Sequence, residues 1–164
     1  MENVNSSKKY FRTLSLIHLA IIVGIVVLES GFVYFNAFSL FVNPQIYSSQ
    51  LFMFLVPFSI IFAVLQMKYL LKAKLYLLKA EGDLKTKMDG YKEMVISRFA
   101  FLTSPCFIVI AAIARTNNLN YLLYVVFVVI ILIIKRPTIQ LAIAELDLNS
   151  EQILALKNPD SIIE

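Results

Sequence analysis

Four long apolar runs constrain this chain more than any other feature. They cover residues 13–35, 51–71, 97–114 and 119–134. A helix needs about 20 apolar residues, or about 17 at the short end, to cross the hydrocarbon core of a bilayer. In addition, 59% of the chain is hydrophobic and only 16% is charged, whereas soluble domains are typically about 25% charged. The sequence therefore predicts an all-α integral membrane protein, a bundle of four transmembrane helices.

Basic residues predict which side of the membrane each connection faces. Lys and Arg concentrate on the side that is not translocated. They are dense before the first run, between the second and third runs, and directly after the fourth, at Lys135 and Arg136. The two remaining connections contain only Arg115. We therefore predict a multi-pass protein with both termini in the cytoplasm. The abundance of Lys, Ile, Asn and Phe indicates a bacterial chain, and hence an inner membrane.

The first run has a rival interpretation as a cleaved signal peptide, because basic residues precede it. Its apolar core is longer than the stretch of about 7–15 residues found in signal peptides, and no A-x-A-like site follows it. We therefore expect this run to remain in the protein as a transmembrane helix.

The connection between the second and third runs is predicted to be a cytoplasmic helical hairpin over about 72–96. One apolar stripe continues beyond the second run through Leu71, Leu75 and Leu78. Gly82 and Asp83 then mark a break between helices. A second stripe leads into the third run through Leu84, Met88, Tyr91, Val95, Phe99 and Leu102. Because both stripes have helical spacing, we expect two paired helices that extend a transmembrane domain of residues 1–136.

Lysines of this connection are candidate contacts to anionic lipid headgroups or to a partner protein. They are Lys68, Lys72, Lys79, Lys85 and Lys87. Basic segments beside a span attract anionic lipids. The alternative is that these lysines only fix the topology and solvate one helical face. Because the basic residues flank apolar runs, we expect the lipid bilayer and no nucleic acid as a partner.

Residues 137–164 are predicted to form a cytoplasmic tail of short helices. Pro137 suits the first position of one helix, and Asn149 or Ser150 is a candidate N-cap for a second. After Arg136 the tail has five acidic residues against one lysine, opposite in sign to the hairpin. The tail could dock on the hairpin or on a partner. It could also be an interfacial helix with a frayed end.

Glu29 is the one acidic residue inside the first run. An ionised acid in a span costs at least about 2.5–3.5 kcal/mol on insertion scales, so such a residue usually faces the interior and has a partner. Three arrangements would relieve this cost: an ion pair with Arg115, a proton on the carboxyl, or a water-filled cavity. His18 lies on nearly the same face, about 16 Å along the helix. It could join Glu29 through a water chain that moves protons or cations, or it could snorkel toward the headgroups.

Prolines inside the second and third runs predict helix kinks at Pro57 and Pro105. Broken helices can mark transporter sites. More commonly a proline only bends its helix, and a neighbouring side chain satisfies the freed carbonyl. Ser104 is placed to do this beside Pro105.

The sequence offers little for catalysis or for cofactors. It has one Cys, one His, no Gly-rich phosphate loop and no nucleophile-elbow pattern. Cys106 lies in an apolar run, where a thiol acts as a small hydrophobic side chain. We therefore expect no metal and no cofactor, and we favour a non-enzymatic protein over a membrane enzyme, which is the weakest of the alternatives.

The function that these observations favour is a non-enzymatic accessory or scaffold subunit of a bacterial inner-membrane assembly. Its partner would be another membrane protein or a second copy of the chain. The alternative is a small transporter or channel that moves a proton, a cation or a small molecule through Glu29. The surroundings of Glu29 discriminate between these hypotheses: a dry ion pair favours the scaffold, and a wet cavity favours transport.

Overall fold

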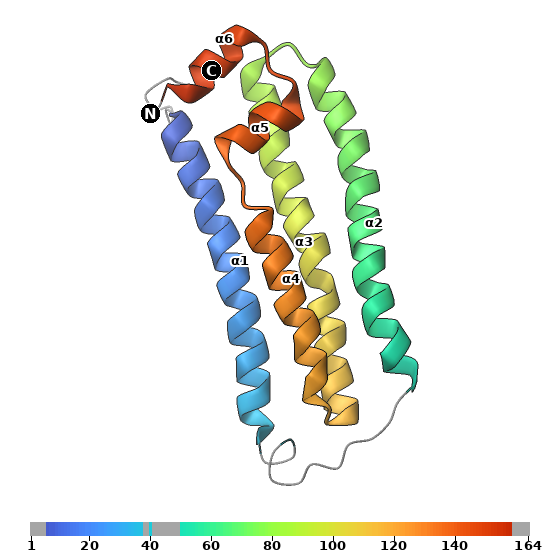
Figure 1. The fold of residues 1–164 in the computed structure, drawn as a ribbon. Coiled ribbons are helices and arrows are strands. Elements are labelled where there is room, and N and C mark those ends of the chain that lie inside the picture. Colours follow the sequence, from blue (N-terminus) through green and yellow to red (C-terminus); the bar gives the residue numbers. More distant parts are fainter. Residues whose placement is uncertain (1–5, 38–39, 41–49, 159–164) are drawn as a thin grey trace. The chain divides into compact units, whose positions relative to one another are not determined.

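The computed structural model describes residues 6–37, 40 and 50–158, and every regular element in these residues is helical. Figure 1 labels the elements in chain order. They are α1 (Ser7–Phe35), α2 (Gln50–Ala80), α3 (Leu84–Thr116), the 3-10 helix η2 (Leu119–Tyr121), α4 (Leu122–Ile134), α5 (Ile139–Leu146) and α6 (Ser150–Lys157). The prediction of an all-α chain is therefore confirmed for the described residues.

Three helices, α1, α2 and α3, are long and apolar enough to cross a membrane. A fourth crossing is reached only if Leu119–Ile134 and Ile139–Leu146 are counted as one broken span. Leu119–Ile134 alone would rise about 24 Å at 1.5 Å per residue, less than the hydrocarbon core of about 30 Å. The described helices are thus those of a multi-pass membrane protein with three or four candidate spans.

The chain divides into two compact units, which differ sharply in charge. The first, here the charged unit, consists of residues 1–19, 68–98 and 136–164; the second, here the apolar unit, consists of residues 20–67 and 99–135. All Asp, Glu, Lys and Arg residues lie in the charged unit except Glu29, Arg115 and Lys135. The tail is grouped with parts of α1, α2 and α3, and the predicted domain division after residue 136 stays a prediction.

In the charged unit, the break predicted at Gly82 and Asp83 is confirmed, since α2 ends at Ala80 and α3 begins at Leu84. Asp83 caps α3: its carboxylate accepts hydrogen bonds from the Thr86 backbone N–H at 2.8 Å and from the Thr86 hydroxyl at 2.7 Å. These bonds to Thr86, the backbone one first, lower the pKa of the Asp83 carboxyl. The local chemistry thus explains where α3 starts.

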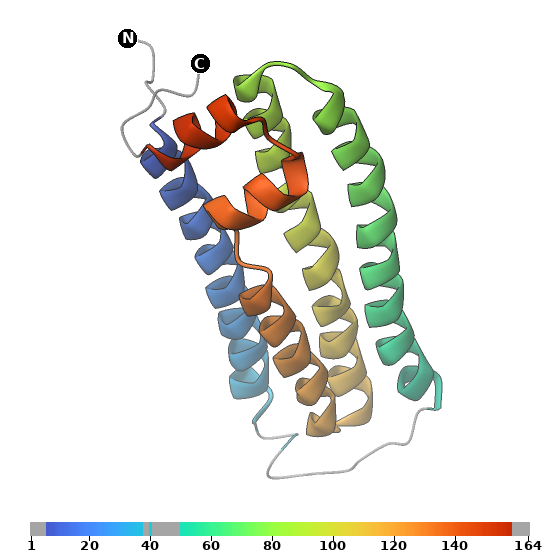
Figure 2. The same cartoon turned by 45° about the horizontal axis from the view of Figure 1, so that its top comes forward.

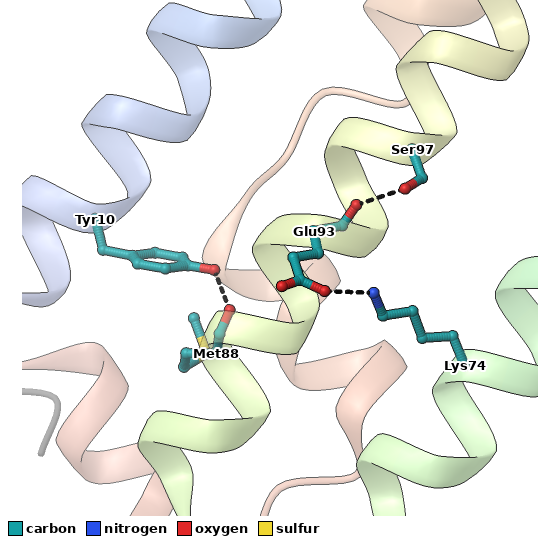
Figure 3. Close-up of polar contacts among 5 residues, drawn as sticks. All are labelled: Tyr10, Lys74, Met88, Glu93 and Ser97. Atoms are coloured by element: carbon teal, nitrogen blue, oxygen red, sulfur yellow. Dashed lines mark hydrogen bonds and ion pairs between the residues drawn. The ribbon is translucent and has the colours of Figure 1, made fainter.

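Within the same unit α2 and α3 pack as an antiparallel pair. The Lys74 ammonium and the Glu93 carboxylate lie 2.8 Å apart (Figure 3). One turn further along α2, Leu78 packs against Gly90 of α3. The predicted stripe on α3 is buried at Met88, Tyr91 and Val95 in this unit, and at Phe99 and Leu102 in the apolar unit. The helical spacing of the sequence therefore identified the inward face of α3 correctly.

The tail folds onto the other segments of the charged unit (Figure 2). The Ser7 hydroxyl donates to the Leu156 carbonyl at 2.6 Å, and the Gln152 side-chain amide donates to the Gly82 carbonyl at 3.0 Å. Leu146 and Leu156 are fully buried. The sequence left open whether the tail docks on the hairpin, docks on a partner or lies at the membrane interface. In the structure the tail docks on its own chain.

The starts of the two tail helices differ in how well the sequence predicted them. Asn149 forms a capping box with Gln152 and precedes α6, as predicted. Pro137 was expected at the first helical position, but α5 begins at Ile139 with Thr138 as N-cap. The physical reason is that the Thr138 hydroxyl accepts the Leu141 N–H at 3.2 Å. A helix with Pro137 at its first position would have Arg136 as N-cap, and an arginine side chain has no acceptor.

The apolar unit buries one set of side chains and leaves many others open. Its buried set includes Val56, Ile60, Val109, Ala112, Ile113, Val128 and Leu132. Large apolar side chains such as Phe54, Phe58, Phe107 and Leu123 are more than half exposed. A soluble monomer rarely exposes so much contiguous apolar surface, whereas lipid tails would cover it.

Candidate functional site

Glu29 of α1 is a buried carboxyl group of the apolar unit. Only 4% of its surface is exposed, and neither carboxylate oxygen has a hydrogen-bond partner among the described residues. Buried polar groups are nearly always satisfied, and an exception requires an explanation. An ionisable residue inside a span is also a functional candidate by default. Glu29 therefore stays the leading candidate within this unit.

The predicted ion pair between Glu29 and Arg115 is absent from the described structure. Arg115 is exposed in the last turn of α3, while both Glu29 oxygens are buried and without a partner there. The physical reason is desolvation. An exposed guanidinium would have to lose its hydration to follow the carboxylate inward, and the Coulomb attraction often fails to repay that loss.

A pocket of about 390 Å³ lies beside Glu29. Its lining consists of Glu29, Ser30, Val33, Tyr34, Ala37 and Leu122. Apart from the Glu29 carboxyl and the two hydroxyls, the lining is apolar. Glu29 lines this pocket, but both of its carboxyl oxygens are buried and not exposed to solvent. The site is therefore neither a dry ion pair nor an open polar cavity.

His18 belongs to the charged unit and is 4% exposed. Snorkelling of its ring toward headgroups was one of the two arrangements that the sequence left open, and the buried side chain does not favour it. The reason is its helical face: Leu14, four residues earlier, is 1% exposed and points inward too. His18 also has an interaction partner. A water chain from His18 to Glu29 stays a prediction.

Pro57 and Pro105 lie inside α2 and α3, and both helices continue past them. At Pro105 the freed carbonyl is that of Phe101, and the Ser104 hydroxyl donates to it at 2.9 Å. The predicted role of Ser104 is confirmed. Pro105 and Ser104 also line a pocket of about 420 Å³ together with Ser59 and Gln66. The kinks themselves stay a prediction.

The five candidate lysines differ in exposure. Lys68, Lys72, Lys79 and Lys85 are exposed and available to lipid or protein. Lys87 is only 5% exposed, so the prediction that it is a surface contact is wrong. Lys87 lies one turn before the fully buried Tyr91, on the inward face of α3.

A buried polar cluster on α3 and α5 was missed by the sequence analysis. The Arg98 Nη2 donates to both oxygens of Glu145, at 2.8 and 3.0 Å. The side chains of this pair are 4% and 21% exposed. Tyr91 is fully buried and lies within electrostatic range of both groups. A signal was available, because Arg98 shares the face of the apolar stripe that includes Tyr91.

No group of three or more His, Cys, Asp or Glu side chains in the described part of the chain is placed to hold a metal ion. A scan against models of protein families, a search of curated proteins and a search of solved structures find no match to this chain. Evidence on its function therefore comes from its own residues.

Proposed function

We propose that the chain is a non-enzymatic accessory or scaffold subunit of a bacterial inner-membrane assembly. In this proposal it crosses the membrane four times, and the charged unit with both termini is cytoplasmic. The separation of charge supports this topology, since the apolar unit has only Glu29, Arg115 and Lys135 as charged residues. The paired parts of α2 and α3 in the charged unit would then form the cytoplasmic hairpin.

The observation that best supports a docking role is one face of α2 in the charged unit. It consists of Tyr69, Lys72, Tyr76 and Lys79, all of them exposed and spaced three or four residues apart. Tyr69 and Tyr76 are 77% and 78% exposed. Exposed apolar surface marks interaction sites, and tyrosine is enriched at interfaces. Tyr76 lies beyond the second apolar run, so in the proposed topology lipid does not cover it.

We expect a photo-crosslinking residue at Tyr76 to capture one membrane protein, or a second copy of the chain, in intact cells. The same residue at Lys92, which is exposed on α3, is the matched control and should capture little. Tyr69→Ser with Tyr76→Ser should reduce co-purification of the captured chain at least tenfold. Equal capture at both positions, or co-purification unchanged by the double substitution, would refute the docking face.

A small transporter or channel is the second candidate, and the unpaired burial of Glu29 beside a pocket favours it. A carboxyl that must change its protonation or its partner during transport cannot be locked in a permanent ion pair. In liposomes, we expect proton or cation flux by the wild type and its loss in Glu29→Gln. A flux equal in both proteins would remove Glu29 from this role.

A further inference from the structure

The inward face of α3 in the charged unit concentrates hydrogen-bond donors and positive charge. Lys87, Tyr91 and Arg98 are 5%, 0% and 3% exposed. Their spacing of four and seven residues places them on one helical face. The acid bonded to this face is Glu145 of α5. Arg98 is thus a buried cation whose ion pair is made by a single carboxylate, while Lys87 lies about 16 Å away along the helix.

The donors of this cluster outnumber the bonds that Glu145 accepts. Arg98 uses Nη2 for both of its bonds to Glu145. The Arg98 Nε is buried and has no hydrogen-bond partner among the described residues. The buried Tyr91 hydroxyl lies close to the Glu145 carboxylate but makes no hydrogen bond of good geometry to it. Orphaned buried donors are rare and costly, and here one orphaned donor and one poorly bonded donor lie near the same carboxylate. A group with more acceptor oxygens than a carboxylate would satisfy the cluster better.

We propose that Tyr91 and Arg98 form a phosphate-binding site, which Glu145 of the tail occupies when the anion is absent. A phosphate group has three or more acceptor oxygens and a charge that matches the basic face. Arginine binds phosphate through two parallel N–H bonds, and Nε is the donor that would complete such a fork. The phosphate and the Glu145 carboxylate therefore compete for Arg98.

The position of Arg98 suggests the source of the phosphate. Arg98 lies at the start of the apolar run 97–114, which in the proposed topology is the depth of inner-leaflet headgroups. An anionic lipid headgroup and free inorganic phosphate share the required chemistry. The site goes beyond the accessory function, and its existence does not depend on a protein partner.

The test is to remove the Glu145 carboxylate by substitution and to measure whether added phosphate then stabilises the protein. In nanodiscs of phosphatidylcholine, millimolar inorganic phosphate should raise the Tm of Glu145→Ala by about 4 °C or more, because a ligand that binds only the folded state stabilises it. Chloride at equal ionic strength should not. The matched control is the double variant Arg98→Met with Glu145→Ala, which lacks the guanidinium fork. Phosphate should raise the Tm of this double variant no more than chloride does. If Glu145→Ala does not fold, Glu145→Gln is measured in the same way.

A second arm identifies the source. If the headgroup of a lipid is the ligand, nanodiscs with phosphatidylglycerol should stabilise Glu145→Ala relative to the double variant, and free phosphate should add little. If free phosphate is the ligand, it should stabilise Glu145→Ala in phosphatidylcholine as well. Should neither phosphate nor phosphatidylglycerol stabilise the single variant more than the double variant, the site does not exist.

Discussion

Glu145→Leu is expected to lower the free energy of unfolding by about 3 kcal/mol, the lower end of the range for breaking a buried ion pair. The substitution keeps a side chain of similar size but leaves the Arg98 guanidinium, with a side chain 4% exposed, without its partner. The lower end applies because Glu145 itself is 21% exposed, so the site is not fully dry. Chemical denaturation of the full chain in detergent measures the effect.

Two comparisons separate loss of the pair from loss of packing. Arg98→Met with Glu145→Leu should recover most of the stability, because an apolar replacement of both partners removes the unpaired charge. Glu93→Leu breaks the exposed pair with Lys74, whose side chains are 37% and 73% exposed, and should cost far less. If Glu145→Leu costs no more than Glu93→Leu, then Arg98 is not held by Glu145.

The sequence predicted the helices and the inward face of α3 because both depend on local spacing. Met88, Tyr91 and Val95 recur every three or four residues, and the structure buries all of them. The caps at Asp83 and Asn149 are equally local, since each uses a residue three positions ahead. Such features follow from the backbone geometry of a helix, which a short stretch of sequence specifies.

The polar contacts could not be predicted in the same way. Arg98 and Glu145 are 47 positions apart and lie on different helices, and no local period relates them. The predicted pairing of Glu29 with Arg115 rests only on which charged residues the outer side contains. A count of charges does not include the desolvation cost that keeps an exposed guanidinium away from a buried carboxylate. Lys87 was assigned to the surface by its charge, although its helical position places it beside buried residues.

Gly90 did give a signal, since a glycine inside a helical pattern often marks a close approach of two elements. The structure shows the approach: a Cβ atom on Gly90 would collide with the Leu78 side chain of α2. Leu78 is itself only 7% exposed, so it has little free space into which it could move. A side chain at residue 90 would therefore force the Leu78 side chain to move within the α2–α3 contact of the charged unit.

Gly90→Leu is accordingly expected to lower the free energy of unfolding by about 3 kcal/mol, the upper end of the range for overpacking a core. The gain in helix propensity on replacing glycine, about 1 kcal/mol or less, reduces the net loss only in part. Hydrogen exchange across residues 72–94 should accelerate, because the two helices must separate to admit the new side chain. Thermal unfolding in detergent gives the net effect.

Leu78→Ala should rescue Gly90→Leu, because it removes the atoms with which the new side chain collides and approximately restores the packed volume. The matched control is Gly24→Leu in α1, where a Cβ atom would meet nothing within 4 Å. That substitution should leave stability unchanged or raise it, since leucine favours a helix over glycine. If Gly90→Leu is as stable as Gly24→Leu, or if Leu78→Ala worsens it, then α2 and α3 do not pack closely at Gly90.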